Sequence, residues 1–240
     1  MHGGVDGYSR YMVFCKASNN NRSLTVKPSF MKAAEQNGIP SRVRMDRGGE
    51  NQGVKDVMEG HRGPGRGSAI MGRSVHNIRI ERAWVDVVKD ALGPFHDTFT
   101  SFCLKEDEGG LGLIDLDRDD HLWALHYVFM PRVNFFLEEF ARQRNLMPLE
   151  SEGEKTPTQL FAMGMLRRQG SSATAAQSFW NQELLAQDWQ DTDEDAGLAD
   201  FRCPLSEEQL DRLRNEVNPL EDIYNDKHAE NMLRHVLVFA

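Results

Sequence analysis

The chain has 240 residues, of which 40% are hydrophobic and 27% are charged. These values are typical of a globular protein with one domain of ordinary size and appendages. No apolar run approaches the roughly 20 residues that cross a bilayer, and no basic region followed by a hydrophobic segment opens the chain. The composition therefore excludes a membrane-spanning helix, and we expect an intracellular protein, nuclear or cytoplasmic.

The net charge of −9 is unevenly distributed along the chain. Residues 1–90 hold 15 Lys and Arg against 9 Asp and Glu, a net charge of +6, whereas residues 91–240 hold 13 against 28, a net charge of −15. A basic region that encloses carboxylates suits a substrate with a phosphate backbone. The alternative interpretation is an ordinary solvated surface.

Three cysteines, Cys15, Cys103 and Cys203, are far apart in the sequence. Their odd number and the absence of a C-x-x-C pair argue against a disulfide framework or a cysteine zinc site. We expect free thiols in a reducing compartment.

The first 61 residues predict a hairpin, a helix, a strand and a second helix. Gly3 to Ser18 reads as two strands around an Asp-Gly turn. Residues 23–37 carry apolar residues at helical spacing, and Pro28 indicates that this helix begins or kinks there. Residues 42–45 are a short alternating strand, and residues 54–61 a short helix.

Two carboxylates are placed as a metal site would need them. Asp46 follows the strand and precedes two glycines, so it should stand exposed at the strand's C-terminal end. Glu81 lies on a predicted helix, near the edge of its apolar face. The apolar residues of that face are Ile80, Trp84, Val87 and Val88. If the end of the strand and the Glu81 helix lie close together in space, the two carboxylates form half of a divalent-cation site.

A segment rich in Gly and Arg, residues 62–73, separates these two elements. It should be mobile, because so many glycines cannot hold one helix or one long strand throughout. It is either a flexible connector or a basic flap that touches phosphates beside the carboxylates.

The second half of the sequence predicts helices that pack in a core and offers few candidate catalytic or metal-binding residues. Residues 92–116 read as helix and loop, and residues 124–140 as a core helix interrupted at Pro131. His121 and His126 are five residues apart, whereas metal ligands on a helix are spaced by four. We interpret both histidines as structural.

Residues 169–200 are poor in aliphatic side chains and predict an acidic, partly disordered linker, in which Trp180 and Trp189 are candidates for docking. Ser206 and Gln209 form a capping box that opens a helix, and residues 228–239 form a last helix or strand. The helix has Leu210, Leu213 and Val217 on one face. Its acidic residues would repel phosphate, so we favour a packing or oligomerisation tail over a DNA-reading helix-turn-helix.

Three ordered motifs resemble a known family. V-D-G-Y-S-R, then M-D-R-G-G-E-N and S-V-H-N-I-R-I-E-R-A-W, are similar to the catalytic core of the retroviral integrase and transposase superfamily. The resemblance is closest to integrase core domain proteins of animal genomes that derive from mobile elements. Residues 122–145 and the T-P-T-Q-L-F run from Thr156 are similar to the family's closing helices and turn, so the resemblance covers roughly residues 1–165.

The resemblance implies a ribonuclease H-like α/β fold, in which helices flank a mixed sheet. It also implies the joining of DNA ends to target DNA by three carboxylates and two divalent ions, Mg²⁺ or Mn²⁺. Asp46 matches the second carboxylate and Glu81 the third, with 34 residues between them, so both are expected to be catalytic and metal-binding. The residues expected to contact DNA are Arg62, Arg66, Arg73, His76, Asn77, Arg79 and Arg82.

The family's first carboxylate is not matched. In the family it lies on an earlier strand in a W-x-x-D context, whereas this chain starts at Met1, and we interpret Asp6 as a turn residue that caps its own hairpin. We therefore expect an N-terminally truncated copy with little or no catalytic activity. Because the family's first strand lies between two others, its loss leaves two unpaired edges that invite association with another copy or another chain.

These inferences define three segments and two hypotheses. The segments are an incomplete integrase-like core (1–165), the acidic linker (166–200) and a helical C-terminal segment (201–240). The first hypothesis is a polynucleotidyl transferase core for DNA integration, inactive in this form. The second is a host-retained, non-catalytic module that binds nucleic acid through its basic face or a protein partner through its acidic tail.

Overall fold

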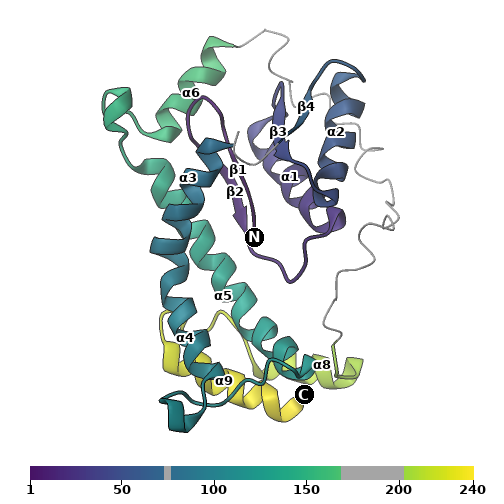
Figure 1. The fold of residues 1–240 in the computed structure, drawn as a ribbon, viewed down its shortest axis with the longest axis vertical. Coiled ribbons are helices and arrows are strands. Elements are labelled where there is room, and N and C mark those ends of the chain that lie inside the picture. The colour runs from purple at the N-terminus through teal and green to yellow at the C-terminus, as the bar shows by residue number, and fades with distance from the viewer. Residues whose placement is uncertain (73–76, 169–202) are drawn as a thin grey trace. The chain divides into compact units, whose positions relative to one another are not determined.

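A computed structural model describes residues 1–72, 77–168 and 203–240, and Figure 1 draws it as a ribbon. The chain divides into two compact units. Unit 1 comprises Met1–Val85 and Glu138–Leu198, and unit 2 comprises Asp86–Leu137 and Ala199–Ala240. The segment boundaries drawn from the sequence at residues 165 and 200 stay a prediction.

Unit 1 contains all four described strands and the helices around them. Its elements are β1 (His2–Val5), β2 (Met12–Lys16), α1 (Ser23–Asn37), β3 (Val43–Asp46), α2 (Gln52–Arg62), β4 (Ala69–Gly72), most of α3 (Ile78–Val87) and α6 (Pro157–Arg167). Short 3₁₀ turns lie at Gly49–Asn51 and Glu150–Glu152.

The regular elements that the structure describes in unit 2 are all helices or helical turns. Unit 2 contains a π-helical turn (Val88–Leu92), α4 (Gly93–Cys103), a 3₁₀ turn (Glu106–Glu108), most of α5 (Asp119–Leu146), α8 (Glu207–Glu216) and α9 (Asp226–Phe239). The predicted hairpin, the strand before Asp46, the helix that carries Glu81 and the Ser206–Gln209 capping box are all confirmed.

The described strands form two separate two-stranded sheets, so one mixed sheet is not seen among them. In the first sheet β1 and β2 are antiparallel, with His2 opposite Lys16. In the second, β3 and β4 are parallel, with Val43 opposite Ala69. The sequence did not predict β4, because four residues directly after a glycine-rich loop are too few to show alternation. The molecule is thus a mixed α/β protein, mostly helical, with small sheets.

A side chain closes the outer edge of β2. The backbone N–H of Met12 donates to Asn145 Oδ1 (2.8 Å), and Asn145 Nδ2 donates to the carbonyl oxygen of Met12 (3.0 Å). Both residues are buried. Asn145 therefore satisfies the two backbone groups as a neighbouring strand would, and it fixes the C-terminal end of α5 to the hairpin.

Helices α1 and α2 pack on β3 and form the core of unit 1. The buried side chains of this cluster are Val26, Phe30, Met31, Ala34, Ile39, Met45, Val54, Val57 and Met58. Helix α1 spans Ser23–Asn37, the range that the apolar spacing predicted, so of the two alternatives for Pro28 a helix start there is excluded. Burial of one helix face outweighs the single backbone hydrogen bond that an exposed Pro28 removes.

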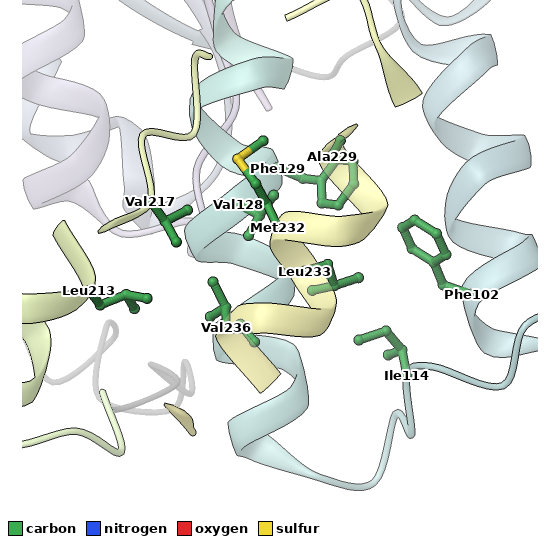
Figure 2. Packing of buried hydrophobic residues seen from close by; sticks show 11 residues of the cluster. Phe102, Ile114, Val128, Phe129, Leu213, Val217, Ala229, Met232, Leu233 and Val236 are labelled. Atoms are coloured by element: carbon green, nitrogen blue, oxygen red, sulfur yellow. The ribbon is translucent and has the colours of Figure 1, made fainter. Parts of the chain in front are cut away.

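Apolar side chains from α4, α5, α8 and α9 make the core of unit 2, and Figure 2 shows them pointing toward one another. The labelled residues are Phe102, Ile114, Val128, Phe129, Leu213, Val217, Ala229, Met232, Leu233 and Val236. Helix α5 runs through Pro131 without a break, which corrects the predicted interruption. Residues on both sides of the proline are buried, Val128 and Phe129 before it and Leu137 after it, and this packing keeps the helix continuous.

The three cysteines are free thiols, as predicted. Cys15 is buried in β2, and this burial raises the pKa of its thiol to about 11. Burial also raises the pKa of Cys103. Neither environment favours the reactive thiolate, so a catalytic role for these two residues has no support.

One buried arginine holds the connection between α8 and α9. Arg132, only 2% exposed, donates through Nη1 to the carbonyl oxygens of Pro219 (2.8 Å) and Glu221 (3.1 Å), and through Nη2 to that of Asp222 (2.9 Å). Burial lowers the pKa of its guanidinium, and Asp226 and Asp222 oppose this effect. A single cation thus satisfies three carbonyl groups that end or follow a helix.

We expect Arg132→Ala to lower the free energy of unfolding by about 3 kcal/mol, because it removes charge-assisted hydrogen bonds and leaves these carbonyls unpaired. The measurement is denaturant unfolding followed by circular dichroism. Arg234→Ala is the control, because Arg234 forms an exposed ion pair with Glu230 in the same unit and should cost no more than about 1 kcal/mol. Equal losses for both variants would contradict the role of Arg132.

Candidate functional site

Asp46 stands at the C-terminal end of β3 and is half-buried. Its Oδ1 accepts a short hydrogen bond of 2.5 Å from Asn77 Nδ2. Its backbone carbonyl oxygen accepts from Asn51 Nδ2 at 3.2 Å. The strand end is therefore held on one side by the turn that follows it and on the other by the residue that precedes α3.

Glu81 lies one helical turn beyond Asn77. The N–H of Glu81 donates to the carbonyl oxygen of Asn77 (3.1 Å), which places the two residues on the same side of the helix start. The Glu81 side chain is exposed. The structure thus brings Asp46 against a residue one turn away from Glu81.

The same end of α3 also contacts the hairpin. The guanidinium of Arg79 donates to the carbonyl oxygens of Gly7 and Tyr8, the latter at 3.3 Å. The Trp84 ring lies so close to Gly3 that a Cβ added there would be 2.7 Å from Cη2. Glycine is needed at position 3 because a larger side chain would displace the tryptophan. Helix α3 therefore contacts both the β1–β2 hairpin and the end of β3.

Asp6 serves the hairpin turn, as the sequence predicts. Its Oδ2 accepts hydrogen bonds from the N–H of Tyr8 (3.1 Å), from the N–H of Ser9 (2.7 Å) and from the Ser9 hydroxyl (2.7 Å). These bonds are those of an aspartate that caps its own turn. One carboxylate oxygen, Oδ2, accepts all three of these bonds.

The basic loop between α2 and β4 presents Arg66 to solvent. The loop contains Gly63, Gly65 and Gly67 at φ of +89°, +77° and +67°, a conformation that other residues rarely adopt. Arg66 is exposed and its Nη2 lies 3.4 Å from the Ser41 hydroxyl. The glycines thus allow the loop conformation in which the positively charged Arg66 side chain is exposed.

Arg62, at the end of α2, contacts the chain's own backbone. Its Nη2 donates to the carbonyl oxygen of Ile39 (2.8 Å) and its Nε to that of Pro40 (3.3 Å). Burial and the nearby charge of Arg66 lower the pKa of its guanidinium. Arg62 thus supports the segment before β3 and adds charge next to Arg66.

The remaining predicted DNA contacts divide into two groups. Arg79 and Arg82 are exposed on α3, next to Glu81. Arg73 and His76 lie outside the described residues. The DNA contacts assigned from the sequence stay predictions.

His121 and His126, on or beside α5, are in structural settings. His121 Nδ1 accepts from the N–H of Asp115 (3.0 Å), which fixes the loop before α5. His126 is half-buried on α5, and burial lowers its pKa. A hydrogen-bonded His121 agrees with the structural interpretation.

Over the ranges 1–72, 77–168 and 203–240, no three His, Cys, Asp or Glu side chains are grouped to hold a metal ion. Asp46 and Glu81 supply two carboxylates, and Asn77 occupies one oxygen of the first. A pair of metal ions needs a ligand shared between the two ions and further ligands for each. The residues described here do not fit such a pair.

A cavity of about 1470 Å³ lies in unit 1 beside Asp46 and Asn77. Its walls come from β1, β3, α1, α6 and the start of α3. Glu50 and Asn51, which follow β3, line it as well. Sequence reasoning did not assign roles to these two residues, although both belong to the M-D-R-G-G-E-N motif.

A carboxylate at a strand end, hydrogen-bonded to the residue that precedes a helix with two exposed arginines, is an arrangement suited to a nucleic-acid-processing protein. A family comparison makes this specific: residues 1–175 match the integrase core domain, and the chain belongs to that family. No curated protein and no solved structure matches the chain. In the part of the chain that the structure describes, no helix has the length and apolar character to span a membrane.

We expect Asn77→Ala to lower the free energy of unfolding by about 1.5 kcal/mol, because Asp46 loses a charge-assisted partner in a half-buried position. Asn77→Asp should be worse, since it places a second carboxylate against the first. Denaturant unfolding of both variants measures the effect. If both match the unaltered protein, the contact between β3 and α3 does not contribute to the fold.

Proposed function

We propose that this chain is an integrase core that binds DNA through α3 and the Arg66 loop and that is catalytically incomplete in the form described. The observation that carries the proposal is the Asp46–Asn77 hydrogen bond, because it joins the carboxylate strand to the helix that exposes Arg79 and Arg82. We further propose that the two small sheets correspond to parts of a ribonuclease H-like sheet.

The distribution of charge supports DNA as the partner. Residues 1–90 carry a net charge of +6 within a chain of net charge −9. Exposed Arg66 and Arg82 belong to this basic region. Because phosphate contacts supply most of the sequence-independent affinity for DNA, such a surface is suited to bind a duplex backbone.

Catalysis by the family's chemistry would need Mg²⁺ or Mn²⁺ held by carboxylates. Asp46 and Glu81 are the residues that we assign to that role. Two carboxylates, one of them hydrogen-bonded to Asn77, are too few for paired ions. We therefore propose that strand transfer requires a carboxylate that the described residues do not supply.

The second candidate function is a non-catalytic module that binds nucleic acid or a protein partner. The Asn77 bond favours it as well, because that bond occupies the carboxylate that a metal ion would need. The acidic C-terminal half, with a net charge of −15 in residues 91–240, is the part that would bind a basic protein partner.

The first test is DNA affinity as salt concentration rises, measured by fluorescence anisotropy with a labelled duplex. We expect log K to fall linearly with log salt, and the double variant Arg66→Ala/Arg82→Ala to reduce that slope by about 2, one per lost phosphate contact. An affinity that does not change with salt would contradict phosphate binding.

Arg214→Ala is the matched control for this measurement. Arg214 is an exposed arginine on α8, in the acidic half of the chain. Its removal changes net charge by the same amount as one of the tested substitutions but should leave the salt slope unchanged. A slope that falls equally in this variant would assign the effect to net charge alone.

The second test is strand transfer of a DNA end in Mg²⁺ and in Mn²⁺. We expect the unaltered chain and Glu81→Gln to give the same background of joined product. A metal-dependent product that disappears in Glu81→Gln would show that the chain is active and would contradict the proposed incompleteness.

A further inference from the structure

One face of α3 carries two large apolar side chains that stay exposed. Ile78 is 72% exposed and Val85 is 57% exposed. They are seven residues apart, so they lie on the same face of the helix, two turns from each other. Ala83 and Val87 are both buried and lie on the opposite side of the helix. Large apolar side chains that gather on one exposed face mark it as a candidate contact surface.

Two opposite charges lie on the same face, between the apolar residues. Glu81 comes three residues after Ile78, and Arg82 comes three residues before Val85, so each shares the face with its apolar neighbour. Both charged side chains are exposed. In the described part of the chain, the structure places no salt-bridge partner against either of them. Along the helix the face therefore has the order apolar, acidic, basic, apolar.

This order is complementary to itself. When a second copy of the helix runs antiparallel to the first and is centred between residues 81 and 82, Ile78 lies opposite Val85 of the second copy. Glu81 then lies opposite Arg82 of the second copy. Two-fold symmetry repeats each contact, so the pair covers four apolar side chains and forms two ion pairs. A parallel pair in register would instead place like charges together, which is unfavourable.

We propose that α3 binds α3 of a second copy of this chain in an antiparallel pair, which makes the chain a two-fold symmetric dimer. The charges select this occupant. A partner of one charge sign would attract one of the two side chains and repel the other, whereas a second copy neutralises both.

The dimer is weak and depends on protein concentration. Helix α3 has ten residues, so it is about 15 Å long and about 10 Å wide with its side chains. One such face is too small to provide the roughly 1,200–2,000 Å² that stable interfaces bury.

The test is analytical ultracentrifugation of the full chain at low salt, over protein concentrations up to about 1 mM, where even weak pairs are populated. We expect a monomer–dimer equilibrium for the unaltered chain. Arg82→Glu should raise the dissociation constant of the dimer about tenfold, because both ion pairs become repulsive. Glu81→Arg should raise it by a similar factor for the same reason. An unaltered chain that stays monomeric throughout would overturn the proposal.

The double variant Glu81→Arg/Arg82→Glu separates this pairing from a general effect of charge. It exchanges the two charges and keeps the net charge of the chain, so the antiparallel pair regains both ion pairs. We expect its dissociation constant to return to within about twofold of that of the unaltered chain, the coupling that a double-mutant cycle detects. A double variant that dimerises as weakly as either single variant would contradict the antiparallel arrangement.

The apolar contacts have a matched control in the same unit. Leu166, on α6, is 71% exposed, nearly the same as Ile78. We expect Ile78→Asp to raise the dissociation constant at least about tenfold, because it removes an apolar contact twice per dimer. Leu166→Asp should leave the dissociation constant unchanged. Equal effects of the two substitutions would place the contact elsewhere and overturn the proposal.

The proposal does not rest on DNA binding. Arg82 is also one of the residues that we assign to DNA contact, so the dimer is measured in the absence of DNA. A missing dimer would leave the DNA proposal intact, and a missing DNA complex would leave the dimer intact. Circular dichroism spectra of all variants that match the unaltered chain show that the exposed substitutions keep the fold.

Discussion

The hydrogen bond between Asn77 and Asp46 is the contact on which the site depends. It joins the end of β3 to the start of α3, across 31 positions of sequence. At the same end of the helix, the Arg79 guanidinium donates hydrogen bonds to carbonyl oxygens of the hairpin turn. This set of bonds places α3, with its exposed Arg79 and Arg82, beside the carboxylate strand, and it also engages the carboxylate that metal chemistry would require.

The basic and acidic parts of the chain also differ in what they contribute. The basic first part holds the site, and the acidic remainder supplies helices whose apolar faces form the separate core shown in Figure 2. Arg132 is the exception within that acidic part, because it is buried and bonds three carbonyl oxygens rather than a phosphate or a carboxylate. Arg132 thus supports the fold of unit 2, as Arg62 supports the segment before β3 in unit 1.

Local signals in the sequence predicted local structure well. The Asp6 turn and the Ser206–Gln209 capping box depend on residues within three positions of one another, so their chemistry is visible in the sequence. The predicted interruption of the helix at Pro131 was wrong, because tertiary packing keeps α5 continuous. The Asp46–Asn77 bond and the short strand β4 depend on contacts distant in sequence, which periodicity does not encode.

We propose that DNA binds to α3 and to the Arg66 loop. Amide hydrogen exchange with and without a DNA duplex, at low salt, tests it most directly because it reports each segment separately. We expect slower exchange in Ile78–Val87 and in residues 63–68, with no change in Glu207–Glu216. Protection confined to Glu207–Glu216, or absent throughout, would contradict it.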